Sequence, residues 1–234
     1  MMPDRAIPPR IIVVIPAYNE ELTVSGVILS IRHLVDWDIL VVDDCSSDST
    51  NLEAQTAGAS VITLPVRAGA WRAIQCGFMY ARDEDYDVVV TMDADGQHSA
   101  KSLQNLVAPL IEHSCDVVVG VYTARAPWLK RMTWNAFRKM FDLSLEDVTS
   151  GFRAYNRSTV DVLLSEEATM LSFQDIGVLI LLKNAQKKVV DQEVIMYERG
   201  VGISRIFPSW IAIWIYISQT TLLCVSKLSM PWQK

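Results

Sequence analysis

The chain has 234 residues, 50% of them hydrophobic and 21% charged, and this composition excludes an intrinsically disordered protein. The length accommodates one large α/β domain with a complete core. The net charge of −6 argues against a nucleic-acid binder that relies on a generally basic surface.

Short apolar runs alternate with segments of helical periodicity along the first half of the chain. Ile11–Ile15 is predicted to be a buried strand, and Pro16–Glu21 ends it and opens a helix with Asn19 as its N-cap. Helical periodicity follows over Leu22–Leu34. Further strands are predicted at Ile39–Val42, Val61–Leu64, Val88–Met92 and Asp116–Gly120, with helices that open after Asp43–Thr50 and span Ala70–Ala81 and Ser102–His113. Gly77 is interpreted as a tolerated glycine inside a helix.

This alternation predicts βαβ units, right-handed crossovers and a mainly parallel central sheet flanked by helices, which is an α/β fold. In such a sheet, ligands bind beyond the carboxyl ends of the strands. Three polar clusters follow predicted strands: Pro16–Glu20, the pair Asp43 and Asp44, and the pair Asp93 and Asp95. We therefore expect the three clusters to share one rim of the sheet.

The second half of the chain is less regular. Trp128–Leu143 has the pattern of an amphipathic basic helix, and a polar loop is predicted over Glu146–Arg157. Basic residues outnumber acidic ones between Arg125 and Arg157, which suits an anionic ligand, a membrane surface or a solvated helix face. The remaining predicted elements are helices at Val160–Leu164 and Ile176–Leu182 and a strand at Lys188–Ile195.

The last apolar segment, Ile206–Val225, carries four adjacent polar residues at Ser218–Thr221. A spanning helix needs about 20 mostly apolar residues, so these polar residues count against spanning. We expect an interfacial helix with Trp210 and Trp214 at the headgroup level, or a helix that packs on protein. The predicted organisation is one domain over residues 1–205 and an apolar helix over 206–234.

Cysteine usage favours a reducing compartment. None of the four cysteines forms a C-x-x-C pair or lies near a histidine at metal-ligand spacing. The apolar run Ile11–Ile15 is too short for a signal peptide. Together with the segment 206–225, these features predict a cytoplasmic protein that is peripheral on the cytoplasmic face of a membrane.

Two carboxylates follow the apolar run Val88–Met92 at i, i+2 spacing. In extended backbone, side chains two residues apart point the same way, so Asp93 and Asp95 can converge on one point. Hard oxygen ligands suit Mg²⁺ or Mn²⁺, which in turn suits a ligand that carries phosphates. The alternative interpretation is a solvated, aspartate-rich turn.

The three clusters together supply what a nucleotide-diphospho-sugar site needs. Pro16–Glu20 can hold a nucleobase and ribose by stacking and hydrogen bonding, and Asp43 or Asp44 can bind the base or ribose edge. A metal held by Asp93 and Asp95 would neutralise the charge that develops on a leaving diphosphate.

In order along the chain, these motifs resemble the family 2 glycosyltransferases of GT-A fold. The resemblance is carried by Val13–Glu21, Val41–Thr50 and Asp93–His98. The segment Asp147–Arg153 and, beyond it, Glu198, Arg199, Gly202, Ser204 and Arg205 resemble the dolichol- and polyprenyl-phosphate mannosyl- or glucosyltransferase branch. The likeness runs from about Ile11 to Arg205 and implies a GT-A fold.

The resemblance implies transfer of a hexose from GDP-mannose or UDP-glucose to a polyprenyl or dolichyl phosphate, with inversion. Contacts to the nucleotide sugar are implied for Pro16, Ala17, Tyr18, Glu20, Asp44, Asp93, Ala94 and Asp95. Binding of Mg²⁺ or Mn²⁺ is implied for Asp93, Asp95 and Gln97, and contacts to the acceptor or a phosphate for Ser150, Arg153, Arg199, Ser204 and Arg205. Asp95, Asp147 and Arg153 are the expected catalytic residues. The expected partners are the nucleotide sugar, the lipid phosphate and a membrane surface, and a membrane-protein partner or a homo-oligomer stays open.

The chemistry of a phosphate acceptor agrees with these roles. A phosphate monoester has a second pKa of about 6, so it is ionised near neutral pH and needs no strong general base. Cationic residues that position it matter more, and Arg153, Arg199 and Arg205 supply such charges. A sugar-hydroxyl acceptor would need a base, for which Asp147 is the candidate.

Two segments depart from the family pattern. Gly120-Val121-Tyr122 stands where the family usually has Gly-Ser-Arg, with Arg125 three residues later. Arg67–Ala70 stands where the family usually has a lysine between glycines. The sequence therefore predicts the family more firmly than it predicts the donor or the acceptor.

Four other functions remain as alternatives. Ile39–Asp44 also resembles the start of a response-regulator receiver, which is a signalling module. A nucleotidyltransferase would share the sheet and the paired carboxylates, but Pro16–Glu20 is not its Gly-rich loop. A glycosyltransferase that acts on a glycan hydroxyl would share the donor half of the site. A donor-binding subunit would use Ile206–Val225 to dock on a membrane partner.

Overall fold

The computed structural model describes residues 8–122, 150–171 and 176–197. Within them, one sheet has the strand order β3-β2-β1-β4-β6-β5-β7. Strand β6 is antiparallel to both of its neighbours, and the other pairs are parallel. The strands are β1 (Ile11–Ala17), β2 (Asp38–Asp43), β3 (Ser60–Thr63), β4 (Val88–Thr91), β5 (Val117–Val121), β6 (Arg153–Asn156) and β7 (Val189–Glu193).

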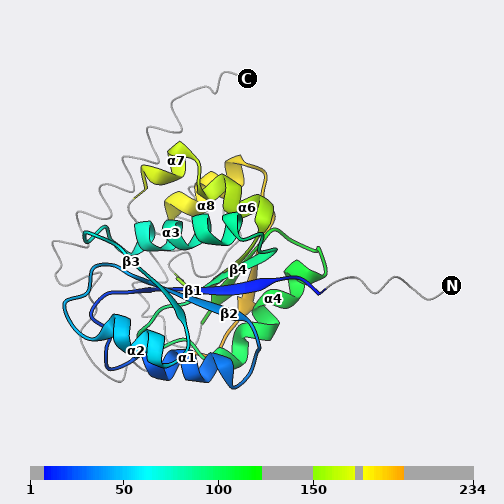
Figure 1. Ribbon diagram of the computed structural model, residues 1–234. Coiled ribbons are helices and arrows are strands. Elements are labelled where there is room, and N and C mark those ends of the chain that lie inside the picture. Colours follow the sequence, from blue (N-terminus) through cyan, green and yellow to red (C-terminus); the bar gives the residue numbers. More distant parts are fainter. Residues whose placement is uncertain (1–7, 123–149, 172–175, 198–234) are drawn as a thin grey trace, which may run out of the picture.

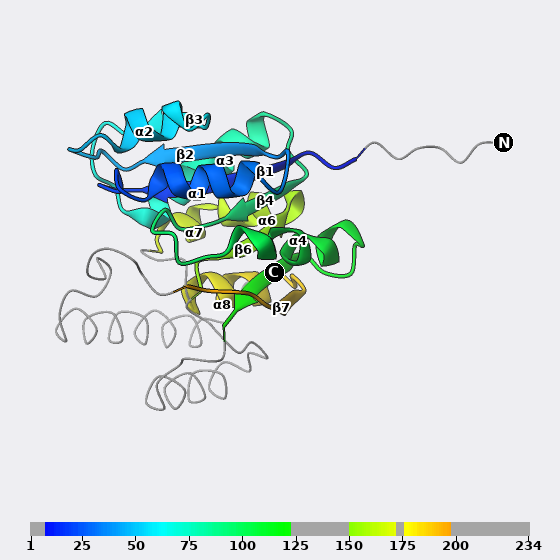
Figure 2. The ribbon, with the colours of Figure 1, turned by 90° about the horizontal axis from the view of Figure 1, so that it is seen from below.

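Helices cover both faces of this sheet. Figure 1 shows α3, α6, α7 and α8 above the sheet and α1 and α2 below it, and Figure 2 views the molecule from the side of α1 and α4. The helices are α1 (Val24–Arg32), α2 (Thr50–Thr56), α3 (Ala70–Asp83), the 3₁₀ turn η1 (Ala100–Ser102), α4 (Leu103–Ile111), α6 (Arg157–Leu163), α7 (Glu166–Thr169) and α8 (Ile176–Asn184).

Strands β1, β2, β4 and β5 are mainly apolar because both faces of the sheet are buried there. In β1, Ile12 and Val14 face the core under α3, while Val13 and Ile15 face the core under α1 and α4. A strand buried on two sides cannot show polar alternation, and this explains the continuous β-branched runs in the sequence. The prediction of a mainly parallel α/β sheet is confirmed.

The chain reverses its direction of travel across the sheet at β1. Strands β2 and β3 continue to one side of β1, whereas β4 pairs with its other side. Helices α1 and α2 correspondingly lie on one face and α3 on the other. The carboxyl ends of β1 and β4 therefore flank a topological switch point, where open α/β sheets bind their ligands.

Three local predictions need correction. Asn19 is no N-cap, because α1 begins at Val24 and Asn19 adopts a left-handed conformation with φ of 53°. The predicted polar loop Glu146–Arg157 is wrong at its end, where β6 lies between β4 and β5 and α6 begins at Arg157. The short helix α7 was not predicted.

Other predicted elements lie outside the described residues. The basic helix at Trp128–Leu143 and the apolar helix at Ile206–Val225 belong to this group, so the proposed division at residue 205 stays a prediction. Within the part of the chain that the structure describes, no helix has the length and apolar character needed to cross a bilayer.

Asp116 joins three segments at the end of the sheet opposite the candidate rim. Its carboxylate accepts hydrogen bonds from the Lys188 backbone N–H and the Asn156 side-chain amide, each at 2.8 Å, and the Lys187 ammonium lies 4.0 Å away. Burial alone would raise the pKa of Asp116, but these hydrogen bonds and the two lysines together lower it below the ordinary aspartate value.

Asp116→Asn should therefore destabilise the protein near neutral pH and lose its effect in acid. A carboxylate whose pKa is depressed in the folded state stabilises the fold above its unfolded pKa of about 3.9 and ceases to do so as pH falls through the folded pKa. We expect the variant's urea midpoint to lie below that of the wild type at about pH 7, with the difference between the two midpoints shrinking as the pH falls below about 3.9. A gap of constant size across this range would contradict the linkage.

Candidate functional site

The loops that follow β1 and β2 bind each other at the rim. Asn19 donates its backbone N–H to the Ser46 hydroxyl at 2.9 Å, and its side-chain oxygen accepts the Ser47 N–H at 2.8 Å. The Glu20 N–H donates to the Thr50 hydroxyl at 2.7 Å. Two of the three predicted polar clusters therefore form one hydrogen-bonded unit.

Asp44 is buried and positions a third loop. Its two carboxylate oxygens accept the backbone N–H groups of Ala68 and Gly69, at 2.6 and 2.9 Å, and its own N–H donates to the Ala17 carbonyl at 2.8 Å. Gly69 has a backbone φ of 93°, which residues other than glycine rarely adopt. Asp44 thus fixes the segment that departs from the family pattern, in addition to any contact with a ligand.

Arg67 lies over the ring of Tyr18. The guanidinium carbon is 4.0 Å from the ring centroid, which is a cation–π contact between the loops that follow β3 and β1. Tyr18 is partly exposed and Arg67 is exposed. This pair presents a flat, cationic surface beside Asp44 that suits a base and an anionic group.

The acidic pair follows β4, but not in the way the sequence suggested. Strand β4 ends at Thr91, and Ala94 and Asp95 form a turn completed by Gly96 at φ of 76°. Within this turn the Asp95 carboxylate accepts the Gln97 N–H at 3.0 Å. The assumption of extended backbone through Asp95 is therefore wrong, because the chain turns at Ala94 and Asp95, and convergence of the two carboxylates stays a prediction.

Asp93 lies against the turn that precedes β6. A Cβ atom added to Gly151 would lie 3.1 and 3.2 Å from the two carboxylate oxygens of Asp93. The Gly151 carbonyl accepts a hydrogen bond from the Thr91 hydroxyl at 2.8 Å, which ties this turn to the end of β4. The segment predicted to contact an acceptor thus packs directly on the segment predicted to hold the metal.

His98 forms a second connection between these segments. Its buried ring stacks on Phe152, with centroids 4.9 Å apart and planes 19° apart. Its Nδ1 atom lies 3.4 Å from the Asp93 backbone nitrogen and 3.8 Å from the Asp93 carboxylate. His98 and Phe152 therefore fix the position of Asp93 from the side opposite the solvent.

Arg153 is completely buried. Its Nε donates to the Ser150 carbonyl oxygen at 2.7 Å, and its side chain lies on the face of the sheet covered by α3 and α6. This geometry gives Arg153 a role in holding the Ser150–Gly151 turn, whereas direct contact with an acceptor stays a prediction.

The donor set at the rim fits a hard divalent cation. The side chains of Asp93, Asp95 and Gln97 offer oxygen ligands, and the Asp93 side chain is 47% exposed. No group of three or more His, Cys, Asp and Glu side chains gathers at metal-binding spacing in the described ranges. Any metal site here would therefore be completed by the Gln97 amide, water or ligand phosphates, which is the usual arrangement for Mg²⁺.

The remaining predicted residues have three kinds of environment. Ala17 and Ala94 are buried in the core, so only their backbone atoms remain for a ligand, and Pro16 is partly buried. Glu20 accepts the Thr23 hydroxyl at 2.9 Å at the start of α1. Asp147, Arg199, Ser204 and Arg205 lie outside the described residues.

Sequence reasoning missed three residues of this rim. Arg67 was assessed only as a departure from a family pattern, and His98 and Gly151 were quoted within motifs without a role. The available signals were the histidine directly after the Asp93–Gln97 motif and the glycine between Ser150 and Phe152. Neither signal shows that residues 98 and 151 meet at Asp93.

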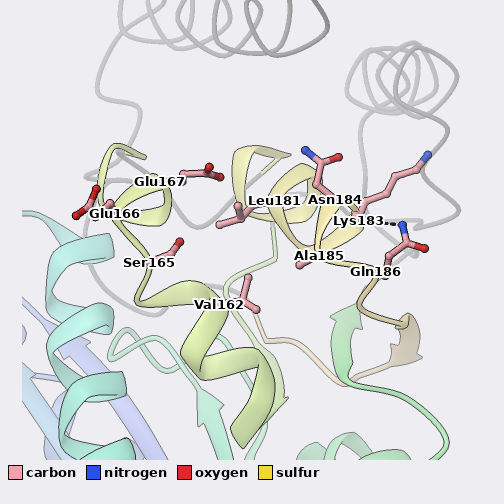
Figure 3. Close-up of a pocket in the computed structure, with 9 residues that line it drawn as sticks. All are labelled: Val162, Ser165, Glu166, Glu167, Leu181, Lys183, Asn184, Ala185 and Gln186. Atoms are coloured by element: carbon pink, nitrogen blue, oxygen red, sulfur yellow. Dashed lines mark hydrogen bonds between the residues drawn. The ribbon is translucent and has the colours of Figure 1, made fainter. Parts of the chain in front are cut away.

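A cavity of about 720 Å³ lies away from this rim. Figure 3 shows its lining residues, which come from α6, α7, α8 and the turn after α8. None of the residues predicted for the site lines it, so we assign the cavity no part in the chemistry of the rim.

Comparisons with known proteins agree with this geometry. A sequence model of Glycosyl transferase family 2 matches residues 12–164. The chain is 30% identical over 216 residues to an undecaprenyl-phosphate mannosyltransferase of Micrococcus luteus, covering 84% of this chain and 87% of the relative. It is 29% identical over 219 residues to a polyprenol monophosphomannose synthase of Mycolicibacterium smegmatis, covering 86% and 82%.

Among solved structures, the fold matches a glucosyl-3-phosphoglycerate synthase of Mycobacterium tuberculosis in complex with Mn²⁺, UDP-glucose and phosphoglyceric acid. The TM-score is 0.72 at 23% identity, covering 97% of this chain and 82% of that chain. At this identity, the match shows the shared fold.

Proposed function

The chain belongs to glycosyl transferase family 2, and from that premise we propose that it transfers a hexose from a nucleotide-diphospho-sugar to a polyprenyl phosphate. It is a glycosyltransferase of GT-A fold. The observation that carries the proposal is the shared rim, where Tyr18, Asp44 and the Asp93–Gln97 turn lie at the switch point of the sheet. Relatives named as polyprenyl-phosphate mannosyltransferases support the choice of acceptor.

On the donor side, we propose that the first two loops bind the nucleoside. Tyr18 would stack on the base or ribose, and Asp44 would hold Ala68 and Gly69 so that their loop lies along the diphosphate. Arg67, positioned over Tyr18, would pair with a phosphate oxygen. Pro16, Ala17, Glu20 and Ala94 would contribute backbone or local contacts.

Asp93, Asp95 and Gln97 would hold Mg²⁺ or Mn²⁺, which when bound would neutralise charge on the leaving diphosphate. The acceptor phosphate oxygen would attack the anomeric carbon as the bond to the diphosphate breaks, giving a sugar lipid phosphodiester with inverted configuration. An ionised phosphate needs no general base, so the protein's task is to position the two reactants. Ser150, and Asp147, Arg199, Ser204 and Arg205 outside the described residues, are the proposed acceptor-side groups.

We propose a peripheral position on the cytoplasmic face of a membrane, where a lipid phosphate is accessible. The segment 206–225 is the proposed contact, and a homo-oligomer or a membrane-protein partner is an alternative mode of attachment. Co-sedimentation with liposomes, with and without residues 206–234, would test this attachment.

A panel of nucleotide sugars would test the donor. GDP-mannose or UDP-glucose should raise the melting temperature more in the presence of Mn²⁺ than in its absence, because a ligand that binds only the folded state stabilises it. Transfer to undecaprenyl phosphate should then occur with that donor. A donor that binds without transfer to any lipid phosphate, while a glycan hydroxyl accepts the sugar, would overturn the proposed acceptor.

Gly151→Ala should weaken metal binding without unfolding the protein. The added methyl would lie 3.1 Å from an Asp93 carboxylate oxygen, so Asp93 must move by a few tenths of an ångström. Asp93 is half-exposed and can move, but the movement would displace a proposed metal ligand. We expect the Mn²⁺ concentration for half-maximal activity to rise by about 10-fold, as when the support of a metal ligand is disturbed. An unchanged Mn²⁺ titration would remove Gly151 from the site.

A further inference from the structure

A groove of about 670 Å³ runs between α1 and residues 96–101, with Tyr197 at its side. The wall on this side is formed by α1 and the residues directly beside it, which recur at the three- and four-residue spacing of one helix stripe: Thr23, Gly26, Val27, Leu29, Ser30, His33 and Leu34. The opposite wall includes Gly96, and Gly96 stands directly between Asp95 and Gln97. The groove is therefore continuous with the proposed metal-binding turn.

No close contact within the described chain requires a glycine at position 26. Gly26 lies exposed inside α1, and a Cβ atom there would meet nothing within 4 Å. Glycine is the least favourable residue inside a helix apart from proline, so a helix glycine that nothing crowds is unexpected for stability alone. Its missing side chain keeps the middle of the groove open.

The edges of the groove are apolar and exposed. Leu29 is 56% exposed, Leu34 is 45% exposed and Tyr197 is 51% exposed. Large apolar side chains gathered around a groove favour contact with a hydrocarbon ligand.

The charge of the groove has one sign. None of the described residues that line it is acidic, although the chain has 27 acidic residues, and the cationic Lys101 lines it. An apolar groove without carboxylates, which opens at a metal site, complements a molecule with a hydrocarbon chain and an anionic head.

We infer that this groove holds the first isoprene units of the lipid-phosphate acceptor, with the phosphate end toward Gly96 and the chain along α1. This inference rests on the proposed function and extends it to how the lipid is recognised. The stripe from Thr23 to Leu34 is about 16 Å long at 1.5 Å per residue, so only the first part of a long chain fits. The acceptor preference should rise with chain length and then level off.

The test compares two acceptors and two substitutions of one glycine, all in the same non-ionic detergent. Gly26→Trp should lower kcat/KM for undecaprenyl phosphate by about tenfold, as expected when the ring displaces a few buried methylene groups. The value for the short, water-soluble geranyl phosphate should fall less, because its short chain fills less of the groove. Gly26→Ala adds only one methyl group and should lower the value for undecaprenyl phosphate much less than Gly26→Trp does.

Four results would contradict the inference, and they have different consequences. An equal effect of Gly26→Trp on both acceptors, or no effect on either, would overturn the groove while leaving the proposed function intact. Loss of vesicle binding by Gly26→Trp, with an unchanged ratio of the two acceptors in detergent, would assign the surface to membrane contact instead. A wild-type protein that transfers sugar to neither lipid phosphate would overturn the proposed function itself.

Discussion

Asp95→Asn is expected to reduce kcat/KM for sugar transfer at least about a hundredfold, which corresponds to ~2.7 kcal/mol of transition-state stabilisation. The amide keeps the oxygen that accepts the Gln97 N–H, so the turn should persist while the negative charge is lost. The Mn²⁺-dependent part of donor binding should disappear with it. Steady-state kinetics and thermal shifts with and without Mn²⁺ would measure the two effects separately.

Asp83→Asn is the matched control for this substitution. It makes the same change of charge on a carboxylate that is 64% exposed and pairs with its neighbour Arg82. Exposed pairs of this kind contribute little, so the control should leave kinetics and stability within error of the wild type. Equal activity of Asp95→Asn and Asp83→Asn would remove Asp95 from the metal site.

Gly77→Ala is expected to have the largest effect on stability among the glycine substitutions. Helix α3 crosses β1 so closely at this point that an added Cβ would lie 2.3 Å from Cγ1 of Val14 and 3.0 Å from its Cγ2. Val14 is a β-branched residue with no exposed surface, so it cannot rotate away. We expect a net loss of about 2 kcal/mol in the free energy of unfolding, since overpacking outweighs the better helix propensity of alanine.

The same substitution at Gly26 should have the opposite sign. Gly26→Ala meets nothing within 4 Å, so only the gain in helix propensity, about 1 kcal/mol, remains. Urea denaturation of both variants would show the contrast. In a Val14→Ala background, Gly77→Ala should become neutral or stabilising, and a loss that persists there would place the strain elsewhere.

The sequence predicts the parallel half of the fold well because local pattern and burial agree there. Val88–Val90 and Ile39–Val42 are continuous apolar runs between polar turns, and both lie within strands of the sheet. Strand β6 cannot be predicted in this way, because it begins at Arg153 and ends at Asn156, with only two apolar residues between them. Only its pairing with β4 and β5 identifies it as a strand. Gly77 was interpreted as merely tolerated, and its contact with Val14 requires the packed helix.

Some features of the candidate site could likewise be predicted from the sequence, and others could not. The family assignment and the three polar clusters were evident from motifs, and the receiver alternative is wrong, because the chain belongs to a glycosyltransferase family. The stack of Arg67 on Tyr18 and the contact of Gly151 with Asp93 join residues far apart in sequence. No local pattern encodes such contacts, so they follow only from the strand order.

The antiparallel direction of β6 has a consequence for the design of chimaeras. Strand β5 ends at the rim, and β6 begins there, because it runs against both of its neighbours. The stretch of chain between Tyr122 and Ser150 therefore starts and ends beside the Asp93–Gln97 turn, while Gly151 stays packed on Asp93. We expect replacement of this stretch to leave the register of the strands unchanged, because the paired residues of β5 and β6 lie outside it. We expect chimaeras joined at Tyr122 and Ser150 to retain the donor half and to show whether this stretch sets the acceptor preference.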